Sequence, residues 1–311
     1  MQSRPLRIFF SRLAPPLCAL LSACAGPGYY FQAIEGQLGV MQRTRAIDAI
    51  LDDPASGAAL KQRLAYVLEA RTFASRELAL PDNGSYRGYA DLPRPYVTWS
   101  VYATPELSLK PLRWCFPVAG CVAYRGYFSE QAAQAFARRL QRDGHDVYVA
   151  GVAAYSTLGW FSDPLPSPVL RRSDVEVAGI IFHELAHQRL YLRGDSAFNE
   201  SFAMTVEIEG LRRWLQAGCS GEDCASSVQR QTLHDYLQDK QRHEEFVGLL
   251  LKHRAVLQAL YDSSLPDVDK RARKAQVFQE LKQDYLTLKN GWGGYGGYDR
   301  WFESSLNNAR L

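Results

Sequence analysis

The sequence lacks a surplus of either charge once its first residues are set aside, and it contains no internal repeat. Its 36 basic residues outnumber the 33 acidic ones by three, and three arginines, Arg4, Arg7 and Arg12, lie within residues 1–23, where no acidic residue occurs. The remaining chain is therefore neutral, and no basic run stands out in it. Proteins that bind nucleic acid carry clustered positive charge, so we expect no nucleic-acid partner.

The N-terminus holds an apolar run, residues 13–21, that is too short to span a bilayer comfortably. It follows the three arginines and leads into the tetrapeptide LSAC at residues 21–24, which resembles the lipobox of bacterial lipoproteins. By that resemblance residues 1–23 are a signal peptide and Cys24 carries the lipid anchor. It also implies sorting to the outer membrane, facing the periplasm, because Ala25 rather than an aspartate follows the cysteine. A plain secretory signal or an N-terminal membrane helix is the alternative.

The rest of the sequence predicts one globular domain of the α+β class. With 47% hydrophobic and 22% charged residues, the chain is too apolar for a disordered protein. After a short Gly/Pro tether at residues 24–29, we expect a single domain at residues 30–311. Residues 30–170 are predicted to form a helical hairpin and a small antiparallel or mixed sheet, and residues 171–311 a mainly helical part.

Periodicity and turn residues place the elements within these two parts. Besides the helix that carries the histidines described below, helices are predicted at residues 30–52, 57–77, 130–143, 199–216, 225–260 and 267–289. Strands are predicted at residues 96–103, 112–116, 121–128 and 146–155. Ser129 is expected to cap the helix that follows it. The tail after Lys289, rich in glycine and aromatic residues, predicts an ordered loop or lid.

Four cysteines remain after the leader and Cys24, and they fall into two close pairs. An exported protein sits where disulfides persist, so two small loop-closing bridges are predicted. Zinc binding by all four together is the alternative, and it is disfavoured because the spacings are not C-x-x-C. The pairs are Cys115 with Cys121 and Cys219 with Cys224.

Two histidines and a glutamate stand together in the segment IIFHELAHQ, residues 180–188. In a helix, residues four apart lie on one face, so His183 and His187 direct their imidazoles toward a common centre. Glu184 is offset by about 100° around the helix, where it reaches a water at the metal without binding the metal itself. Burying these three side chains unpaired on an otherwise apolar helix would cost several kcal/mol. Either a bound metal or structural pairing would avoid this cost, and the H-E-x-x-H pattern alone does not decide between them.

A third ligand is available downstream, in the segment NESFAMTVE at residues 199–207. A catalytic zinc needs three protein ligands and an open fourth position. HELAH followed by N-E-x-F-A-x-x-x-E resembles the zinc metallopeptidases called gluzincins, especially their large aminopeptidase family. The residues that match the second motif are Asn199, Glu200, Phe202, Ala203 and Glu207.

This resemblance implies a zincin-like fold with one zinc ion per chain. It implies that His183, His187 and Glu200 bind the zinc and that Glu184 is the general base and proton shuttle. Together with the lipobox and the segment YSTLGWF at residues 155–161, the whole mature chain resembles a bacterial family of zinc aminopeptidases that are predicted lipoproteins. A peptide is then the expected substrate, and a membrane is the expected partner of the N-terminus.

The spacing leaves other ligand assignments open. Twelve residues separate His187 from Glu200, whereas the gap in the aminopeptidase gluzincins is longer. Either Asp195 or Glu207 is an alternative third ligand. If Glu200 is the ligand, we expect Asn199 and Glu207 to orient the ligands through hydrogen bonds. The metzincin pattern is excluded, because Leu190 and Arg193 stand where it needs glycine and histidine.

The sequence gives weaker support for two parts of the predicted mechanism, the binding of a free α-amine and the stabilisation of the oxyanion. The G-x-M-E-N motif by which gluzincin aminopeptidases bind a free α-amine is absent from the chain. A tetrahedral oxyanion needs a stabilising group beside the metal. Tyr155 is the first choice, and Tyr295 and Tyr298 are the alternatives.

The other histidines lie in polar contexts and are expected at the surface; they are His145, His234, His243 and His253.

The sequence thus predicts a lipid-anchored zinc metallopeptidase, of aminopeptidase type by resemblance. A zinc endopeptidase or cell-wall peptide hydrolase is the first alternative. The second alternative is a non-catalytic envelope lipoprotein that acts as a scaffold.

Overall fold

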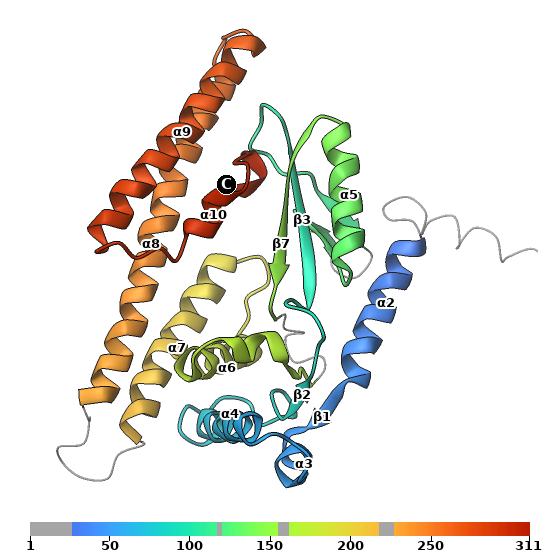
Figure 1. Cartoon of the computed structure of the whole chain (residues 1–311), viewed down its shortest axis with the longest axis vertical. Coiled ribbons are helices and arrows are strands. Elements are labelled where there is room, and N and C mark those ends of the chain that lie inside the picture. The colour runs from blue at the N-terminus through green and yellow to red at the C-terminus, as the bar shows by residue number, and fades with distance from the viewer. Residues whose placement is uncertain (1–26, 117–119, 155–161, 218–226) are drawn as a thin grey trace, which may run out of the picture.

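The computed structural model describes residues 27–116, 120–154, 162–217 and 227–311 of the chain (Figure 1). Helices dominate this part of the protein. They are α2 (Pro27–Gln42), α3 (Ile47–Asp52), α4 (Ala58–Arg76), α5 (Glu130–Arg142), α6 (Asp174–Arg189), α7 (Ser196–Ala217), α8 (Ser227–Asp262), α9 (Asp267–Gly291) and α10 (Asp299–Glu303), with short 3-10 helices η2 (Ser167–Arg171) and η3 (Asn308–Arg310).

The strands form three small sheets, so the architecture is α+β. The largest sheet is antiparallel, in the order β6-β3-β7, and α5 packs against it. A second sheet, β1-β2-β8, is mixed, because β2 runs antiparallel to β1 and parallel to β8. The strand bounds are β1 Thr44–Ala46, β2 Gly88–Ala90, β3 Thr98–Pro105, β4 Trp114–Phe116, β5 Gly120–Val122, β6 Arg125–Tyr127, β7 His145–Val152 and β8 Leu165–Pro166.

The hairpin of β4 and β5 carries a disulfide. Cys115 and Cys121 lie directly opposite each other in its register, and the bond joins them across a Cα–Cα distance of 3.9 Å. Cys219 and Cys224, the second expected pair, lie outside the described residues.

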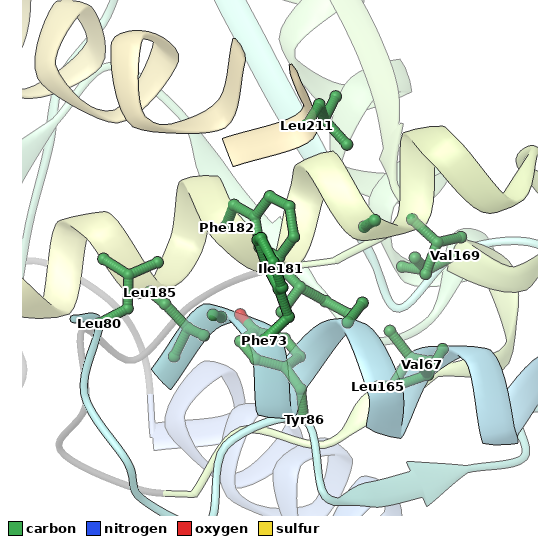
Figure 2. Packing of buried hydrophobic residues seen from close by; sticks show 14 of the residues in the cluster. Val67, Phe73, Leu80, Tyr86, Leu165, Val169, Ile181, Phe182, Leu185 and Leu211 are labelled. Atoms are coloured by element: carbon green, nitrogen blue, oxygen red, sulfur yellow. The ribbon is translucent and has the colours of Figure 1, made fainter. Parts of the chain in front are cut away.

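The main helical core surrounds α6. Figure 2 shows Ile181, Phe182 and Leu185 of this helix packed beside Val67 and Phe73 of α4, and all five are buried. A capping box starts α6: the Ser173 hydroxyl accepts from the Glu176 N–H, and the Glu176 carboxylate accepts from the Ser173 N–H. The histidine-bearing helix is thus fixed at its start and along its apolar face.

A second core lies between the C-terminal half of α8, helix α9 and the tail. Helices α8 and α9 run side by side as a long antiparallel pair, and α10 lies between them and the sheet (Figure 1). Leu257 of α8, Leu281 and Tyr285 of α9, and Phe302 of α10 are buried there. The tail was expected to be a loop or lid, and this was wrong for α10, because its aromatic side chains gain burial against α8 and α9.

Three other expectations differ from the structure. The helix predicted at residues 30–52 is divided into α2 and α3 by β1, which pairs with β2, and of these two helices α3 packs against α4. The tether predicted at residues 24–29 is shorter, because α2 already begins at Pro27. His253 is buried rather than at the surface, and its Nε2 lies 3.0 Å from the Asp284 carboxylate.

Other predicted elements lie where they were expected, with shifted ends. Ser129 caps α5 by accepting from the Ala132 N–H. The strand predicted at residues 121–128 is divided into β5 and β6. Among the described helices, none is long and apolar enough to cross a membrane. The predicted leader and Cys24 lie outside the described residues.

Candidate metal centre

The two histidines of α6 face each other across one helical turn. The Nε2 atoms of His183 and His187 are 3.1 Å apart, and their rings meet nearly edge to face. His187 is buried, and His183 is half-buried, on a helix whose opposite face fills the main core. Because the apolar residues of α6 fix its rotation, both imidazoles are held toward one point.

Glu200 reaches the same point from the first turns of α7. Its Oε2 lies 3.3 Å from His183 Nε2, and its Oε1 lies 3.5 Å from His187 Nε2. The three ligand atoms lie within 4.8 Å of one another, so this group could hold a metal ion. The Glu200 side chain is 62% exposed, which leaves the group open to solvent on the side of α7.

The chemistry of these atoms fits a cation. Glu207 accepts a hydrogen bond from His183 Nδ1, so the Nε2 atom of a neutral His183 carries only a lone pair. The lone pair therefore faces a second imidazole nitrogen and a carboxylate. A single proton can satisfy only one of these contacts, whereas a metal ion between the three would satisfy all of them.

Glu207 is the centre of a buried network behind His183. Its Oε2 lies 2.8 Å from His183 Nδ1, while its Oε1 accepts a hydrogen bond from the Tyr236 hydroxyl and lies 2.5 Å from Lys240 Nζ. Burial raises the pKa of Glu207, but the hydrogen bonds from His183, Lys240 and Tyr236 outweigh it, so that the net pKa is lowered. Burial and the charge of Glu207 raise the pKa of Tyr236, which therefore remains a donor.

The same network separates the pKa values of the two histidines. Burial lowers the pKa of His183, but the hydrogen bond and charge of Glu207, with the charges of Glu184 and Glu200, raise it overall. Burial and then the neighbouring His183 lower the pKa of His187. His187 Nδ1 is buried and has no hydrogen-bond partner among the described residues.

The loop between α6 and α7 is closed by Asn199. Its Oδ1 accepts from the Leu192 N–H and its Nδ2 donates to the Leu192 carbonyl, each at 2.8 Å. Asn199 was expected to orient a ligand by bonding to it, but these bonds hold the backbone instead. By tying the loop down just before Glu200, they allow the short connection to deliver that carboxylate to the histidines.

Asp195, an alternative ligand, has another role in the structure. Its Oδ1 accepts from the Phe198 N–H at 3.0 Å, which caps the first turn of α7. The group that could hold a metal comprises His183, His187 and Glu200 and does not include Asp195. Glu207, the other alternative ligand, bonds to His183 Nδ1 on the side away from the Nε2 atoms.

The end of α6 is supported by a loop that a buried arginine organises. Arg71 of α4 is fully buried and donates to the carbonyls of Ser85, Pro81 and Asn83. The Asn83 side chain in turn donates to the Gln188 side chain at 2.8 Å, next to His187. The position of His187 therefore depends on α4 as well as on α6.

The expected base and the oxyanion candidates have different surroundings. Glu184 is half-buried beside His183 and contributes to raising the pKa of that histidine. Tyr155 lies outside the described residues. Tyr298 stacks on Phe246 of α8 with ring centroids 4.1 Å apart, and Tyr295 lies under the Arg242 guanidinium, so both pack on α8.

Three further residues near the metal-binding group were missed from the sequence. Tyr236 and Lys240 lie four apart on α8, a spacing that indicates a shared face but does not say that the face meets Glu207. Tyr191 is 47% exposed, and its ring centroid lies 6.1 Å from that of His187.

The described part of the chain is thus an α+β protein in which two adjacent helices share a group of side chains that could hold a metal ion. A family model described as "Putative aminopeptidase" matches residues 28–311, and the chain belongs to this family. The name of the family indicates peptidase activity, and hence a hydrolase. Comparisons with curated proteins and with solved structures gave no match.

Proposed function

We propose that the protein is a zinc-dependent aminopeptidase in which His183, His187 and Glu200 bind the metal. The observation that carries the proposal is the convergence of these three ligand atoms, with Glu207 bonded to the far nitrogen of His183. Two imidazoles and a carboxylate, with a carboxylate behind one histidine, are a typical ligand set of catalytic zinc. A zinc ion bound there would polarise a peptide carbonyl and lower the pKa of a water molecule.

The residues of the chain supply the other steps. Glu184 accepts a proton from the attacking water and donates it to the amine nitrogen that leaves. Glu207 keeps the proton of His183 on Nδ1, so that Nε2 remains a ligand. Tyr155 is proposed to steady the oxyanion, and Tyr191 is the alternative because of its position beside His187.

The zincin-like fold and the location are part of the same proposal. Sequence supports anchoring of the mature protein at Cys24 on the outer membrane, with the metal centre facing the periplasm. The substrate class is then a peptide in that compartment.

The test is hydrolysis of peptides with free and with blocked N-termini by the chain from Ala25 to Leu311, before and after removal of metal by a chelator. We expect cleavage that needs the free amine, is lost on chelation and returns with zinc. Glu184→Gln should lower kcat/KM by about 10²- to 10⁴-fold while the zinc content stays unchanged. Glu209→Gln is the matched control on α7, because Glu209 bonds to Arg212 and Arg213 at the surface.

Other outcomes favour the alternatives. Cleavage of blocked peptides would indicate an endopeptidase or a cell-wall peptide hydrolase. Bound zinc without hydrolysis of either kind of peptide would favour the non-catalytic scaffold function.

A further inference from the structure

Helix α2 carries an exposed apolar stripe. Phe31, Ile34, Leu38 and Met41 are 72%, 61%, 49% and 53% exposed, respectively. Their spacing of three, four and three residues places them on one face of the helix. Single exposed apolar side chains are common, but four along one face of a single helix form a surface that needs an explanation.

The other side of α2 is fixed to the body of the protein. A side chain at Gly36 would overlap the Phe128 ring, so the helix passes directly against that residue. Val40 is buried in a small core with Leu92, and the Gln32 side chain accepts from the Phe128 N–H. Because these contacts fix the rotation of α2, the apolar stripe is held outward.

Between α2 and the segment at residues 92–94 lies a groove of about 730 Å³. Phe31, Ile34 and Leu38 line it from the helix, and Arg43 and Arg94 line it with positive charge. Within α2 itself, Glu35 is the single charged residue. The stripe can therefore enter an apolar medium while few charges lose water.

The position of α2 in the chain identifies that medium. The helix begins at Pro27, three residues after the cysteine of the lipobox. Three residues span at most about 10 Å, so a lipid on Cys24 would hold the start of α2 at the membrane surface. In Figure 1, α2 lies at the outer edge of the molecule, away from α8 and α9.

We propose that the stripe of α2 inserts into the boundary between headgroups and acyl chains of a phospholipid membrane. The lipid anchor alone would leave the body free to turn about a short linker. The helix adds a second contact that fixes its orientation, and Arg43, exposed at the end of α2, lies at the level of the phosphates. This proposal rests on the lipid anchor that is part of the proposed function, and it does not depend on the peptidase activity.

Vesicle binding by the unlipidated chain tests the proposal. The chain from Ala25 to Leu311 contains every residue that the structure describes and lacks Cys24, so any binding comes from the protein surface. We expect it to sediment with vesicles of phosphatidylethanolamine and phosphatidylglycerol, and also with vesicles of phosphatidylcholine. Phe31→Ser combined with Leu38→Ser should weaken binding by at least about tenfold, and Phe31→Trp should preserve it.

The matched control is Leu251→Ser combined with Val268→Ser, on α8 and α9. These side chains are 56% and 69% exposed, and their loss should leave binding unchanged. Circular dichroism and thermal unfolding check that each variant folds, which we expect because all four sites are exposed.

Several results would overturn the proposal. One is absence of vesicle binding by the unsubstituted chain, and another is equal binding by the α2 double variant. Binding to the vesicles that contain phosphatidylglycerol, but not to those of phosphatidylcholine, would indicate adsorption by charge rather than insertion. A dimer in analytical ultracentrifugation that the α2 double variant converts to a monomer would assign the stripe to a second copy of the chain.

Discussion

The two halves of α8 differ in what they bury. The N-terminal half directs Tyr236 and Lys240 toward Glu207, so its contacts include polar and charged ones beside the apolar packing of Leu233 and Tyr236. The C-terminal half buries Leu257 and Tyr261 against α9 and the tail, and its buried contacts are mainly apolar. One continuous helix therefore contacts the candidate metal centre near one end and a packing core near the other.

The two halves of α8 are therefore stabilised in different ways, one by apolar burial and the other by the partners of a buried carboxylate. In the apolar half, the stabilising free energy grows with the buried apolar area, and small shifts of the side chains are tolerated. The polar half holds a buried carboxylate whose partners must all stay in place, because a buried charge that loses its partner costs several kcal/mol. Substitutions in the two halves should accordingly have different consequences for metal binding.

The largest expected effect is a loss of stability in two matched variants, each of which creates a cavity in one of the two cores. Leu185→Ala in α6 and Leu281→Ala in α9 each remove a fully buried leucine, and each should lower the free energy of unfolding by about 2–5 kcal/mol. Only Leu185→Ala should also weaken zinc binding, because it loosens the helix that positions both histidines. Chemical denaturation and zinc titration of both variants make the comparison; equal loss of zinc affinity would show that the two cores are not separate.

A smaller effect is expected at the charged partner of Glu207. Lys240→Met removes the ammonium group but keeps most of the side-chain length, and it should weaken zinc binding by about 10- to 100-fold. Lys252→Met, on the same helix, removes an exposed partner of Asp284 and should leave zinc affinity unchanged. Competition with a chromophoric chelator measures both; an unchanged affinity in Lys240→Met would show that Lys240 does not support the metal centre.

The smallest effect is expected at two helical glycines. An added Cβ at Gly179 would lie 2.8 Å from the Tyr236 hydroxyl, so Gly179→Ala should displace that hydroxyl from Glu207 and lower zinc affinity several-fold. An added Cβ at Gly248 meets nothing within 4 Å. Gly248→Ala should raise stability by about 0.5–1 kcal/mol through helix propensity and leave zinc affinity unchanged. Zinc titration and thermal unfolding give both values, and reversed signs would contradict the packing described.

The sequence predicted the helices of the metal-binding group because their signals are local. The spacing of His183 and His187, and the motif that begins at Asn199, each lie within one helix. The structure brings His183, His187 and Glu200 together through the short loop that Asn199 closes. Nothing local indicated that Asp195 would cap α7 instead of facing the histidines.

Long-range contacts account for what the sequence could not predict. The strands of the β1-β2-β8 sheet are two or three residues long, too short for any periodicity. Tyr236 and Lys240 lie far along the chain from Glu207, and only the crossing of α7 and α8 reveals their role. Helix α10 forms in a glycine-rich tail because Phe302 packs against Tyr285, with ring centroids 4.2 Å apart.

The zinc content of three purified chains tests the central claim most directly. The unsubstituted chain, Glu200→Ala and Asp195→Ala would be compared by elemental analysis under identical conditions. Our account predicts one zinc per chain in the unsubstituted protein and in Asp195→Ala, which loses only a helix cap, and loss of zinc in Glu200→Ala. Absence of zinc from the unsubstituted protein, or zinc retained in Glu200→Ala, would contradict the assignment of His183, His187 and Glu200 as the metal ligands.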